Sequence, residues 1–397
     1  NGLDARPPLG WSNWESVGCD VDEAYVRANA RALVDTGLAA LGYASVNVDD
    51  CWAEADRDAQ GHLVPHRGRF PSGIKALADF VHGLDLRFGL YSSAGGHCCQ
   101  HTMPGSLGYE WIDASDFAAW GVDFLKYDGC FMEEAPAVLG DFARRFPFTP
   151  PPVLRYPAMA AALNATGRDI GYEWQFWGLG ADAAQGGRWV AEVCNSWRVA
   201  GDAQPGFANA LSYVDEAERF ADAVPSGPGH WAHLDSLEIG NNASWDALSG
   251  GGRAFARGGG AMTAPQEEAV FSLYAVVKTP LIIGADVTRL KGHSLAAYAN
   301  AEVIAVHQDA LGAAGRRIAG VDDVWGVRLS GDAFCAVVLN RGAEERAVQL
   351  TFAQLGLAGR AYAVRDLWAK KDLGNFTTAF GAKVQGTAAL TIKLTPL

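Results

Sequence analysis

Eight short apolar runs, each followed by a stretch with helical spacing of apolar residues, occupy the first three-quarters of this 397-residue chain. In residues 24–36, for example, Ala, Val and Leu recur at helical spacing, and Gly37 follows as a stop signal. Strands that alternate with helices predict a parallel sheet, and eight units in one run favour an α/β fold closed into a (β/α)₈ TIM barrel. The expected strands are residues 9–14, 44–50, 87–92, 123–128, 169–173, 195–199, 230–237 and 281–285, with further helices at 74–82 and 114–119.

The sequence pattern changes after Asp309. Short alternating runs at residues 324–329, 333–339, 347–352 and 388–394 are separated by turn residues. This pattern predicts a small antiparallel β-sandwich. We therefore expect a catalytic (β/α)₈ barrel over residues 1–309 and a C-terminal β-sandwich over residues 310–397. The second domain has no dense cluster of titratable side chains, so the chemistry is expected in the barrel.

The composition allows a large core and argues against two classes of partner. Hydrophobic residues make up 49% of the chain and charged residues 19%, which is typical of a folded protein rather than a disordered one. The formal net charge of −13 argues against a nucleic-acid partner, since an acidic surface repels phosphate groups. No uninterrupted apolar run reaches about 18 residues, so we expect no membrane span.

The chain contains 7 cysteines, and no group of cysteines and histidines has the spacing of a zinc site. Disulfides are the better interpretation, and they indicate an oxidising compartment. Three glycosylation sequons, at Asn164, Asn242 and Asn375, also favour the secretory pathway. The chain begins at Asn1 without a signal peptide, which we interpret as a mature form. We therefore expect a secreted glycoprotein of the cell wall, vacuole or lysosome.

Charged side chains gather where the expected strands end. Barrel enzymes carry their chemistry at the C-terminal ends of the strands, so these side chains are expected on one rim. A single aspartate at a strand end is often only a helix cap, but the whole set is too large for that role. The set comprises six carboxylates, Asp49, Asp50, Asp128, Glu173, Asp202 and Asp235, and two cations, Lys126 and Arg198.

Aromatic residues near the same strand ends indicate what this rim binds. Carboxylates with few cations suit either a hard metal ion or sugar hydroxyl groups. Flat aromatic rings suit the C–H faces of a pyranose, whereas a metal centre does not need them. The aromatic residues are Trp14, Trp52, Tyr91, Trp174, Trp177 and Trp231. The sequence therefore predicts a sugar-binding site.

Several motifs give the chain a close resemblance to glycoside hydrolase family 27, the α-galactosidase and α-N-acetylgalactosaminidase group. The motifs are PLGWSNW (8–14), NVDDCW (47–52), RFPSGI (69–74), GVDFLKYDGC (121–130), NSWR (195–198) with Asp202, TPLIIG (279–284) and VIAVHQD (303–309). The resemblance runs in order through the chain and includes the C-terminal domain. Within the group, the chain most resembles the plant-type α-galactosidases.

The resemblance implies a retaining glycoside hydrolase that releases terminal α-linked D-galactose by double displacement. It makes Asp128 the nucleophile and Asp202 the acid/base, and it requires no metal or cofactor. Lys126 projects to the same side of its strand as Asp128, so its charge is expected to keep Asp128 ionised. The implied substrate-binding residues are Trp14, Asp49, Asp50, Tyr91, Lys126, Glu173, Trp174, Phe176, Arg198 and Asp235. The expected partner is an α-galactoside oligosaccharide or glycoconjugate.

The family pattern also pairs Cys19 with Cys51 and Cys99 with Cys130, with Cys98 as a competitor for Cys99. Each disulfide would join the loops of neighbouring strands. The chain departs from the family pattern at three places. Ser93 and His233 each stand where the family usually has an aspartate. Tyr172 stands where the family usually has a cysteine, and in some members that cysteine pairs with the one matching Cys194, so Cys194 is expected to be free.

Four other functions are weighed against this one. Glu173 can hydrogen-bond a 2-hydroxyl group, and it and Phe176 fill the space that an N-acetyl group needs, which argues against an α-N-acetylgalactosaminidase. The presence of both Asp49 and Asp50 argues against a β-L-arabinopyranosidase. Intact Asp128 and Asp202 argue against a silent galactose-binding lectin. A metal-dependent hydrolase lacks its usual early His-x-His ligand pair. The sequence leaves the oligomeric state open.

Overall fold

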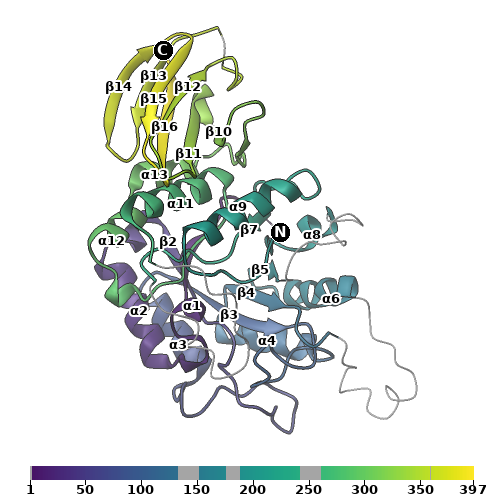
Figure 1. Ribbon diagram of the computed structural model, residues 1–397. Helices are drawn as coiled ribbons and strands as arrows, with labels where there is room; N and C mark the ends of the chain where they lie inside the picture. The colour runs from purple at the N-terminus through teal and green to yellow at the C-terminus, as the bar shows by residue number, and fades with distance from the viewer. Residues whose placement is uncertain (1, 133–151, 176–187, 242–260, 358) are drawn as a thin grey trace.

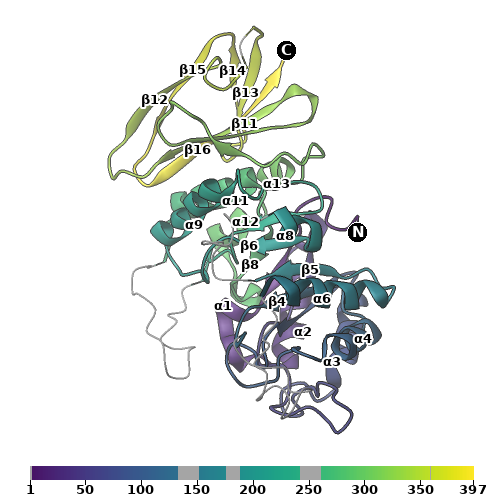
Figure 2. The same cartoon turned by 90° about the vertical axis from the view of Figure 1, so that its right-hand side faces the viewer.

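The computed structural model describes residues 2–132, 152–175, 188–241, 261–357 and 359–397. The barrel strands and their helices form one body, and the C-terminal strands form a second body stacked on one side of it (Figures 1 and 2). The expected fold class is confirmed, because an eight-stranded parallel sheet precedes antiparallel sheets in the chain.

The first sheet runs in the order β7-β6-β5-β4-β3-β2-β1-β8, and each neighbouring pair is parallel. Its strands are β1 (Leu9–Ser12), β2 (Tyr43–Asn47), β3 (Arg87–Ser93), β4 (Phe124–Asp128), β5 (Gly171–Trp174), β6 (Ser196–Arg198), β7 (Trp231–His233) and β8 (Leu281–Ile283). Leu237, which follows β7, forms a parallel bridge with Ile283 of β8. The amide of Leu237 donates to Ile282 over 2.7 Å, so this bridge closes the ring.

The seventh strand is shorter than the sequence predicts. Residues 230–237 form one expected strand, but β7 ends at His233. Asp235 has a φ of 74°, in the left-handed region, and this conformation cannot continue a strand. The turn aims the Asp235 carboxylate at the amide of Ala203, which donates to it over 2.6 Å. The interruption of the strand therefore positions a rim carboxylate.

The helices begin with local signals that the sequence supplies. Asp22 caps α2 by accepting a hydrogen bond from the amide of Tyr25 over 2.7 Å, and Thr263 and Gln266 form a capping box at α11. The α-helices are α1 (Trp14–Val17), α2 (Glu23–Asp35), α3 (Gly73–His82), α4 (Glu110–Trp120), α6 (Pro152–Ala165), α8 (Arg188–Val193), α9 (Phe207–Phe220), α11 (Ala264–Val277), α12 (Gly292–Tyr298) and α13 (Ala301–His307). Single 3₁₀ turns are η1 (Gly18–Asp20), η2 (Ala39–Leu41), η4 (Val287–Arg289) and η5 (Ser330–Asp332).

The C-terminal strands form two antiparallel sheets, a six-stranded one in the order β14-β13-β16-β11-β10-β9 and a pair β12-β15. They are β9 (Arg316–Arg317), β10 (Val324–Arg328), β11 (Phe334–Asn340), β12 (Arg346–Thr351), β13 (Tyr362–Asp366), β14 (Lys371–Phe376), β15 (Ala379–Val384) and β16 (Ala388–Pro396). Phe334 and Val338 from one sheet and Leu350 and Phe380 from the other share a buried core. This arrangement is the expected β-sandwich.

Strand β11 and helix α11 join the two bodies, as Figure 2 shows. Alternate side chains of β11, such as Cys335 and Val337, belong to the core of the barrel, whereas Phe334 and Val338 belong to the core of the sandwich. Ser272 of α11 accepts hydrogen bonds from Trp368 and Thr391, each over 2.7 Å. A contact that is both apolar and hydrogen-bonded holds the sandwich on the barrel. Within the described ranges, no helix is both long and apolar enough to cross a membrane.

Candidate active site

The first part of the rim is an ion pair between strands β2 and β4. The Nζ atom of Lys126 lies 2.7 Å from Oδ2 of Asp49, and the amide of Asp49 is held by Asn13 over 2.8 Å. Burial lowers the pKa of Lys126, but the charges of Asp49, Asp235 and Asp128 outweigh burial and raise it above its usual value. Lys126 is therefore a fixed cation among carboxylates.

Asp50 lies beside this pair and is held by backbone donors. Its Oδ1 accepts from the amide of Cys51 over 2.6 Å, and its Oδ2 accepts from the amide of Gln100 over 2.9 Å. Burial raises the pKa of Asp50 to about 7. Two backbone amides, one for each oxygen, therefore fix the orientation of the Asp50 carboxylate.

Asp128, at the end of β4, is buried and has a hydrogen bond to each carboxylate oxygen. Its Oδ2 accepts from the hydroxyl of Tyr91 over 3.0 Å, and its Oδ1 accepts from the amide of Gly129 over 2.7 Å. Burial raises the pKa of Asp128 to about 7, and the charge of Lys126 opposes this rise without cancelling it. The charge of Lys126 therefore favours the ionised form of Asp128, in the predicted direction, whereas dehydration of this buried side chain favours the protonated form.

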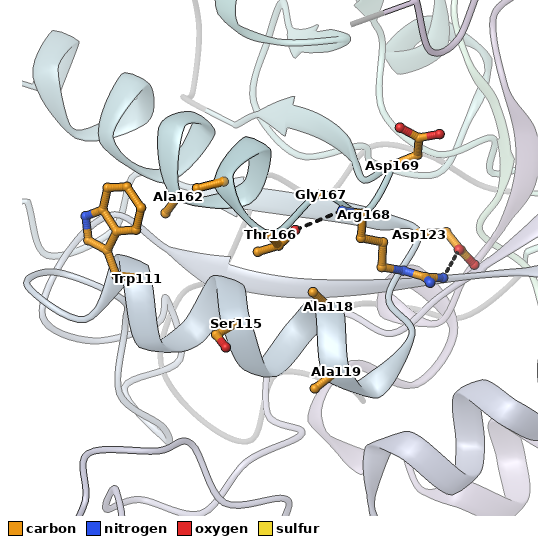
Figure 3. Close-up of a pocket in the computed structure, with 11 residues that line it drawn as sticks. Trp111, Ser115, Ala118, Ala119, Asp123, Ala162, Thr166, Gly167, Arg168 and Asp169 are labelled. Carbon is orange, nitrogen blue, oxygen red and sulfur yellow. Dashed lines mark hydrogen bonds and ion pairs between the residues drawn. The ribbon is translucent and has the colours of Figure 1, made fainter.

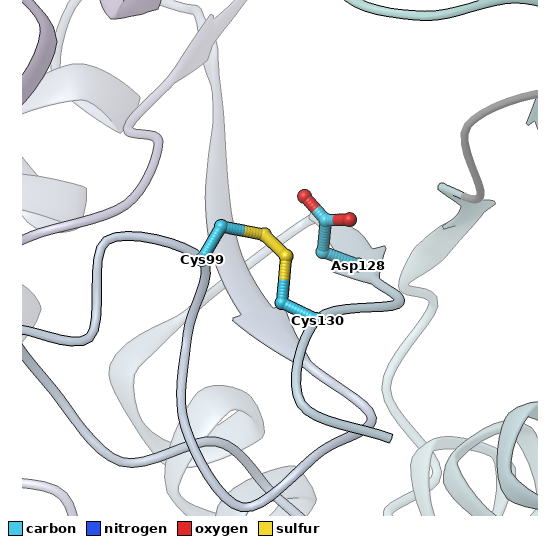
Figure 4. Close-up of side chains that lie close together, drawn as sticks. All are labelled: Cys99, Asp128 and Cys130. Atoms are coloured by element: carbon cyan, nitrogen blue, oxygen red, sulfur yellow. A yellow bond between two sulfur atoms is a disulfide. The ribbon is translucent and has the colours of Figure 1, made fainter. Parts of the chain in front are cut away.

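A disulfide between Cys99 and Cys130 lies directly beside Asp128 (Figure 4). Its Cα atoms are 5.1 Å apart, and the Tyr91 hydroxyl that binds Asp128 also lies 3.0 Å from Cys99 Sγ. Cys99, Asp128 and Cys130 have the mutual spacing of metal ligands, but sulfurs joined in a disulfide offer no thiolates. The disulfide supports the backbone around Asp128 instead.

Arg198, at the end of β6, binds the other two rim aspartates. Its Nη2 atom lies 2.7 Å from Asp235 and 3.4 Å from Asp202. The side chain of Asp202 is 35% exposed, whereas that of Asp235 is 5% exposed. Burial raises the pKa of Asp202 while Arg198 lowers it, and the net shift is upward. Asp202 is thus the most accessible of the six carboxylates and is held loosely.

Glu173 of β5 points into the barrel and is bound from the two following strands. Its Oε2 atom lies 2.7 Å from Nδ1 of His233 and accepts from the hydroxyl of Ser196 over 2.9 Å. A cavity of about 40 Å³ in the barrel interior joins these residues to Asp49, Lys126 and Asp235. The structure therefore brings the predicted carboxylates and cations to one place.

A larger groove of about 900 Å³ lies elsewhere, on the outside of the barrel between α4 and α6 (Figure 3). Trp111 lies at one end, and an ion pair of 2.5 Å between Arg168 and Asp123 lies at the other. None of the six rim carboxylates lines this groove. We therefore place the chemistry at the rim, because convergent titratable groups with shifted pKa values cluster at functional sites.

Comparison with known proteins decides the family. The model of the α-galactosidase A family matches residues 6–309, and that of the α-galactosidase C-terminal β-sandwich domain matches residues 319–394. The chain belongs to glycoside hydrolase family 27. It is 38% identical to an α-galactosidase of Cyamopsis tetragonoloba, over 100% of this chain and 88% of the relative. It is 39% identical to an α-galactosidase of Coffea arabica, over 100% and 95%.

Solved structures agree with this assignment. α-Galactosidase I of Mortierella vinacea superposes with a TM-score of 0.84 at 30% identity, over 99% of this chain and 98% of that one. The α-galactosidase of Saccharomyces cerevisiae with raffinose superposes with a TM-score of 0.81 at 27% identity, over 100% and 99%. The plant relatives, matched over most of their length, make this chain a family 27 α-galactosidase of the plant type.

Three of the predicted binding residues remain to be placed, namely Trp174, Trp14 and Phe176. Trp174 follows Glu173 on β5 and points to the other face of the strand, where its ring packs 5.8 Å from Tyr156 and 5.6 Å from Trp189. Since successive residues of a strand alternate between faces, Trp174 supports α6 and α8, and this corrects its predicted substrate contact. Trp14 is partly buried after β1. Phe176, Trp177 and Asn242 lie outside the described residues.

Three side chains in the site were not among the predicted ones. Gln175 donates to Asp202 over 3.3 Å and accepts from Arg198 over 2.9 Å. Ser196 and His233 bind Glu173. Gln175 and Ser196 each stand two residues from a predicted residue along the chain, so strand alternation was a signal for them. His233 likewise stands two residues before the predicted Asp235, but its contact with Glu173, which lies 60 residues earlier, joins two different strands.

The departures from the family pattern have structural consequences. Ser93 accepts from the amide of Cys130 over 3.2 Å and so helps to hold the loop after Asp128. Tyr172 is buried and donates to the carbonyl of Tyr156 over 3.1 Å. Both family disulfides are present, with Cα separations of 5.2 Å for Cys19–Cys51 and 5.1 Å for Cys99–Cys130. Cys194 is a buried free thiol, as expected, and so are Cys98 and Cys335.

Proposed function

We propose that this retaining α-galactosidase uses Asp128 as its nucleophile and Asp202 as its acid/base to release terminal α-linked D-galactose from oligosaccharides or glycoconjugates. The observation that carries the assignment is the contrast between the two carboxylates. Asp128 is buried with both oxygens held, whereas the Asp202 side chain is 35% exposed. A nucleophile needs a fixed line of attack, and an acid/base must reach both the leaving group and water.

The reaction proceeds in two displacements. In the first, the protonated Asp202 gives its proton to the leaving oxygen while an Asp128 oxygen forms a bond to the anomeric carbon. In the second, Asp202 takes a proton from water, and the water oxygen displaces Asp128 and returns its carboxylate. The upward shift in the pKa of Asp202, caused by burial, favours the protonated form that the first step requires.

Galactose recognition is assigned to the charged groups around these two residues. The Lys126–Asp49 pair offers a donor and an acceptor 2.7 Å apart, which suits neighbouring hydroxyl groups of a sugar. Asp49 and Asp50 are assigned to O4 and O6, Lys126 to O3 and O4, and Glu173 to the 2-hydroxyl group. Tyr91, Arg198 and Asp235 complete the site.

Azide rescue of truncated variants distinguishes the two catalytic roles. Asp128→Gly should be inactive, and azide should attack an activated α-galactoside directly to give β-galactosyl azide. Asp202→Gly should still form the glycosyl-enzyme from an activated substrate, and azide should then give α-galactosyl azide. With the unmodified protein, proton NMR should show α-galactose as the first product. Exchanged azide products would reverse the assignment, and initial β-galactose would overturn retention.

The substrate class is tested by comparing three p-nitrophenyl glycosides, namely the α-D-galactoside, its N-acetylated analogue and the β-L-arabinopyranoside. We expect the galactoside to have the highest kcat/KM, because Glu173 is a charged acceptor and its site is built from polar contacts. A preference for the N-acetylated sugar would assign the protein to α-N-acetylgalactosaminidase instead.

An extracellular or vacuolar location is part of the proposal. The two disulfides require an oxidising compartment, and Asn164 and Asn375 are exposed side chains in glycosylation sequons. Expression in a eukaryotic host behind a secretion signal should give a product that an endoglycosidase converts to a smaller mass. Asn164→Gln and Asn375→Gln should each reduce that shift, and no shift in any variant would contradict glycosylation.

A further inference from the structure

One oxygen of Glu173 receives both of the hydrogen bonds that neighbouring strands offer it. Oε2 lies 2.7 Å from Nδ1 of His233 on β7 and 2.9 Å from the hydroxyl of Ser196 on β6. Within the described residues, no side chain donates to Oε1. The terminal torsion of a glutamate is broad, and its two oxygens exchange places easily. Two donors that both bind Oε2 hold the carboxylate in one orientation. The arrangement therefore reserves Oε1 for another donor.

The charge on Glu173 fixes the direction of the His233 hydrogen bond. Burial raises the pKa of Glu173, but His233, Lys126 and Arg198 outweigh burial and leave the pKa below its usual value. An ionised carboxylate can only accept, so Nδ1 of His233 must carry the proton. An aspartate, the family's usual residue at this position, would have no proton to donate when ionised.

We propose that His233 is a positioning residue that acts through Glu173 and thereby sets recognition of the galactose 2-hydroxyl group. This inference rests on the proposed function, since it takes Glu173 as the partner of that hydroxyl. With Oε2 held by His233 and Ser196, Oε1 is presented to the sugar in one orientation. His233 is 6% exposed and lines the same interior cavity as Glu173 and Lys126, so water does not compete strongly for its bond.

The proposal predicts a loss confined to one position of the sugar. In His233→Ala, Glu173 keeps the charges of Lys126 and Arg198 but loses its shortest hydrogen bond, the one from His233. D-Galactose should then bind as an inhibitor about 10-fold more weakly, the lower end of the effect of a charged hydrogen bond. 2-Deoxy-D-galactose, which lacks the 2-hydroxyl group, should bind within about twofold of its unmodified affinity. A structural role for His233 would weaken both sugars alike.

His233→Asn is the conservative variant, because its Nδ2 atom can occupy about the place of Nδ1 and donate to Glu173. It should restore most of the affinity for D-galactose. His307→Ala is the matched control, since His307 is also a buried histidine, and its Nε2 atom donates to the carbonyl of Thr279 over 2.7 Å. Any effect of His307→Ala should be equal for the two sugars.

The experiment measures inhibition constants of the two sugars against hydrolysis of p-nitrophenyl α-D-galactoside, with thermal melting as a check on folding. If His233→Ala does not fold, Ser196→Ala removes the second donor from the same oxygen. It should also weaken the binding of D-galactose more than that of 2-deoxy-D-galactose. Equal losses for both sugars in these variants would overturn the role of His233 while leaving the proposed function intact. An unmodified protein that cleaves no α-galactoside would overturn the proposed function itself.

Discussion

The ammonium group of Lys126 lies 2.7 Å from the Asp49 carboxylate, although strand β3 separates the strands that carry them. Lys126 lies on β4, two residues before Asp128, and its contact with Asp49 forms across the barrel mouth. Lys126 lowers the pKa of both Asp128 and Asp202, while burial raises both. This cation therefore connects the proposed galactose site with the ionisation of the two carboxylates proposed as catalytic.

Lys126→Met should reduce kcat/KM by about 10- to 150-fold, since a charged hydrogen-bond donor to the sugar is lost. It should also move the acidic limb of the kcat/KM profile to higher pH. Removing the cation raises the pKa of Asp128 above about 7, so a higher pH is needed to ionise the nucleophile. A lower kcat/KM with an unmoved acidic limb would limit Lys126 to sugar binding.

The two disulfides form a matched pair for a second prediction. They close loops of 32 and 31 residues, so each should stabilise the fold by about 2–4 kcal/mol through similar chain entropy. Only Cys99–Cys130 adjoins Tyr91 and Asp128. The two double variants, Cys99→Ser with Cys130→Ser and Cys19→Ser with Cys51→Ser, should lower the Tm by similar amounts. Loss of Cys99–Cys130 should also lower kcat by about 10- to 100-fold, whereas loss of Cys19–Cys51 should have a smaller effect on kcat.

Both pairs should be removed in a Cys98→Ser background, because the free thiol of Cys98 is adjacent to Cys99 and could pair with Cys130. The measurements are thermal melting and steady-state kinetics under the same conditions. Equal losses of kcat in the two double variants would contradict a specific role of Cys99–Cys130 beside the nucleophile.

Glu15 and Glu238 are buried carboxylates near the rim, 2% and 6% exposed, and Asn241 donates to Glu238 Oε2 over 2.8 Å. Burial raises the pKa of both, and the charge of Glu15 raises that of Glu238 further. A carboxyl group whose pKa is higher in the folded state favours folding in its protonated form. Its contribution to stability is therefore complete below the unfolded pKa of about 4.3 and is lost as the pH rises through the folded pKa. Glu238→Gln should therefore raise the Tm at pH 7, with a gain that shrinks towards pH 4.

The matched control is Glu23→Gln, which should have the opposite sign. Burial of Glu23 is outweighed by hydrogen bonds from Ser72 and Arg27, so its pKa is lowered. Its charge therefore stabilises the fold above the unfolded value, and Glu23→Gln should lower the Tm at pH 7. Melting curves between pH 4 and pH 8 test both variants, and a Tm of Glu238→Gln below that of the unmodified protein at pH 7 would contradict the assignment.

Glu173→Ser should shift the preference between galactose and its N-acetylated analogue. The serine removes the charged acceptor for the 2-hydroxyl group, so kcat/KM for the galactoside should fall by about 10- to 150-fold. The smaller side chain also leaves space near the 2-position, so the ratio of the two kcat/KM values should move towards the N-acetylated sugar. An unchanged ratio would mean that Glu173 does not contact the 2-position.

Local patterns in the sequence determined the architecture and most of the charged site. Eight apolar runs alternating with helical periodicity predict a parallel barrel, but the count of units does not decide closure, which depends on the bridge between Leu237 and Ile283. Residues at strand ends share one rim in any such barrel, so Asp49, Lys126 and Asp128 could be predicted together. The disulfides followed from the family pattern.

The tertiary structure alone decided how deeply each group is buried and which atom each donor reaches. Burial raises the pKa of Asp128 to about 7 despite Lys126, and that balance depends on atoms contributed by several strands. His233 and Glu173 are 60 residues apart, and their contact depends on the register of β5, β6 and β7. Periodicity fixes which face of its own strand a residue occupies, whereas dehydration and hydrogen bonding depend on neighbours that only packing brings together.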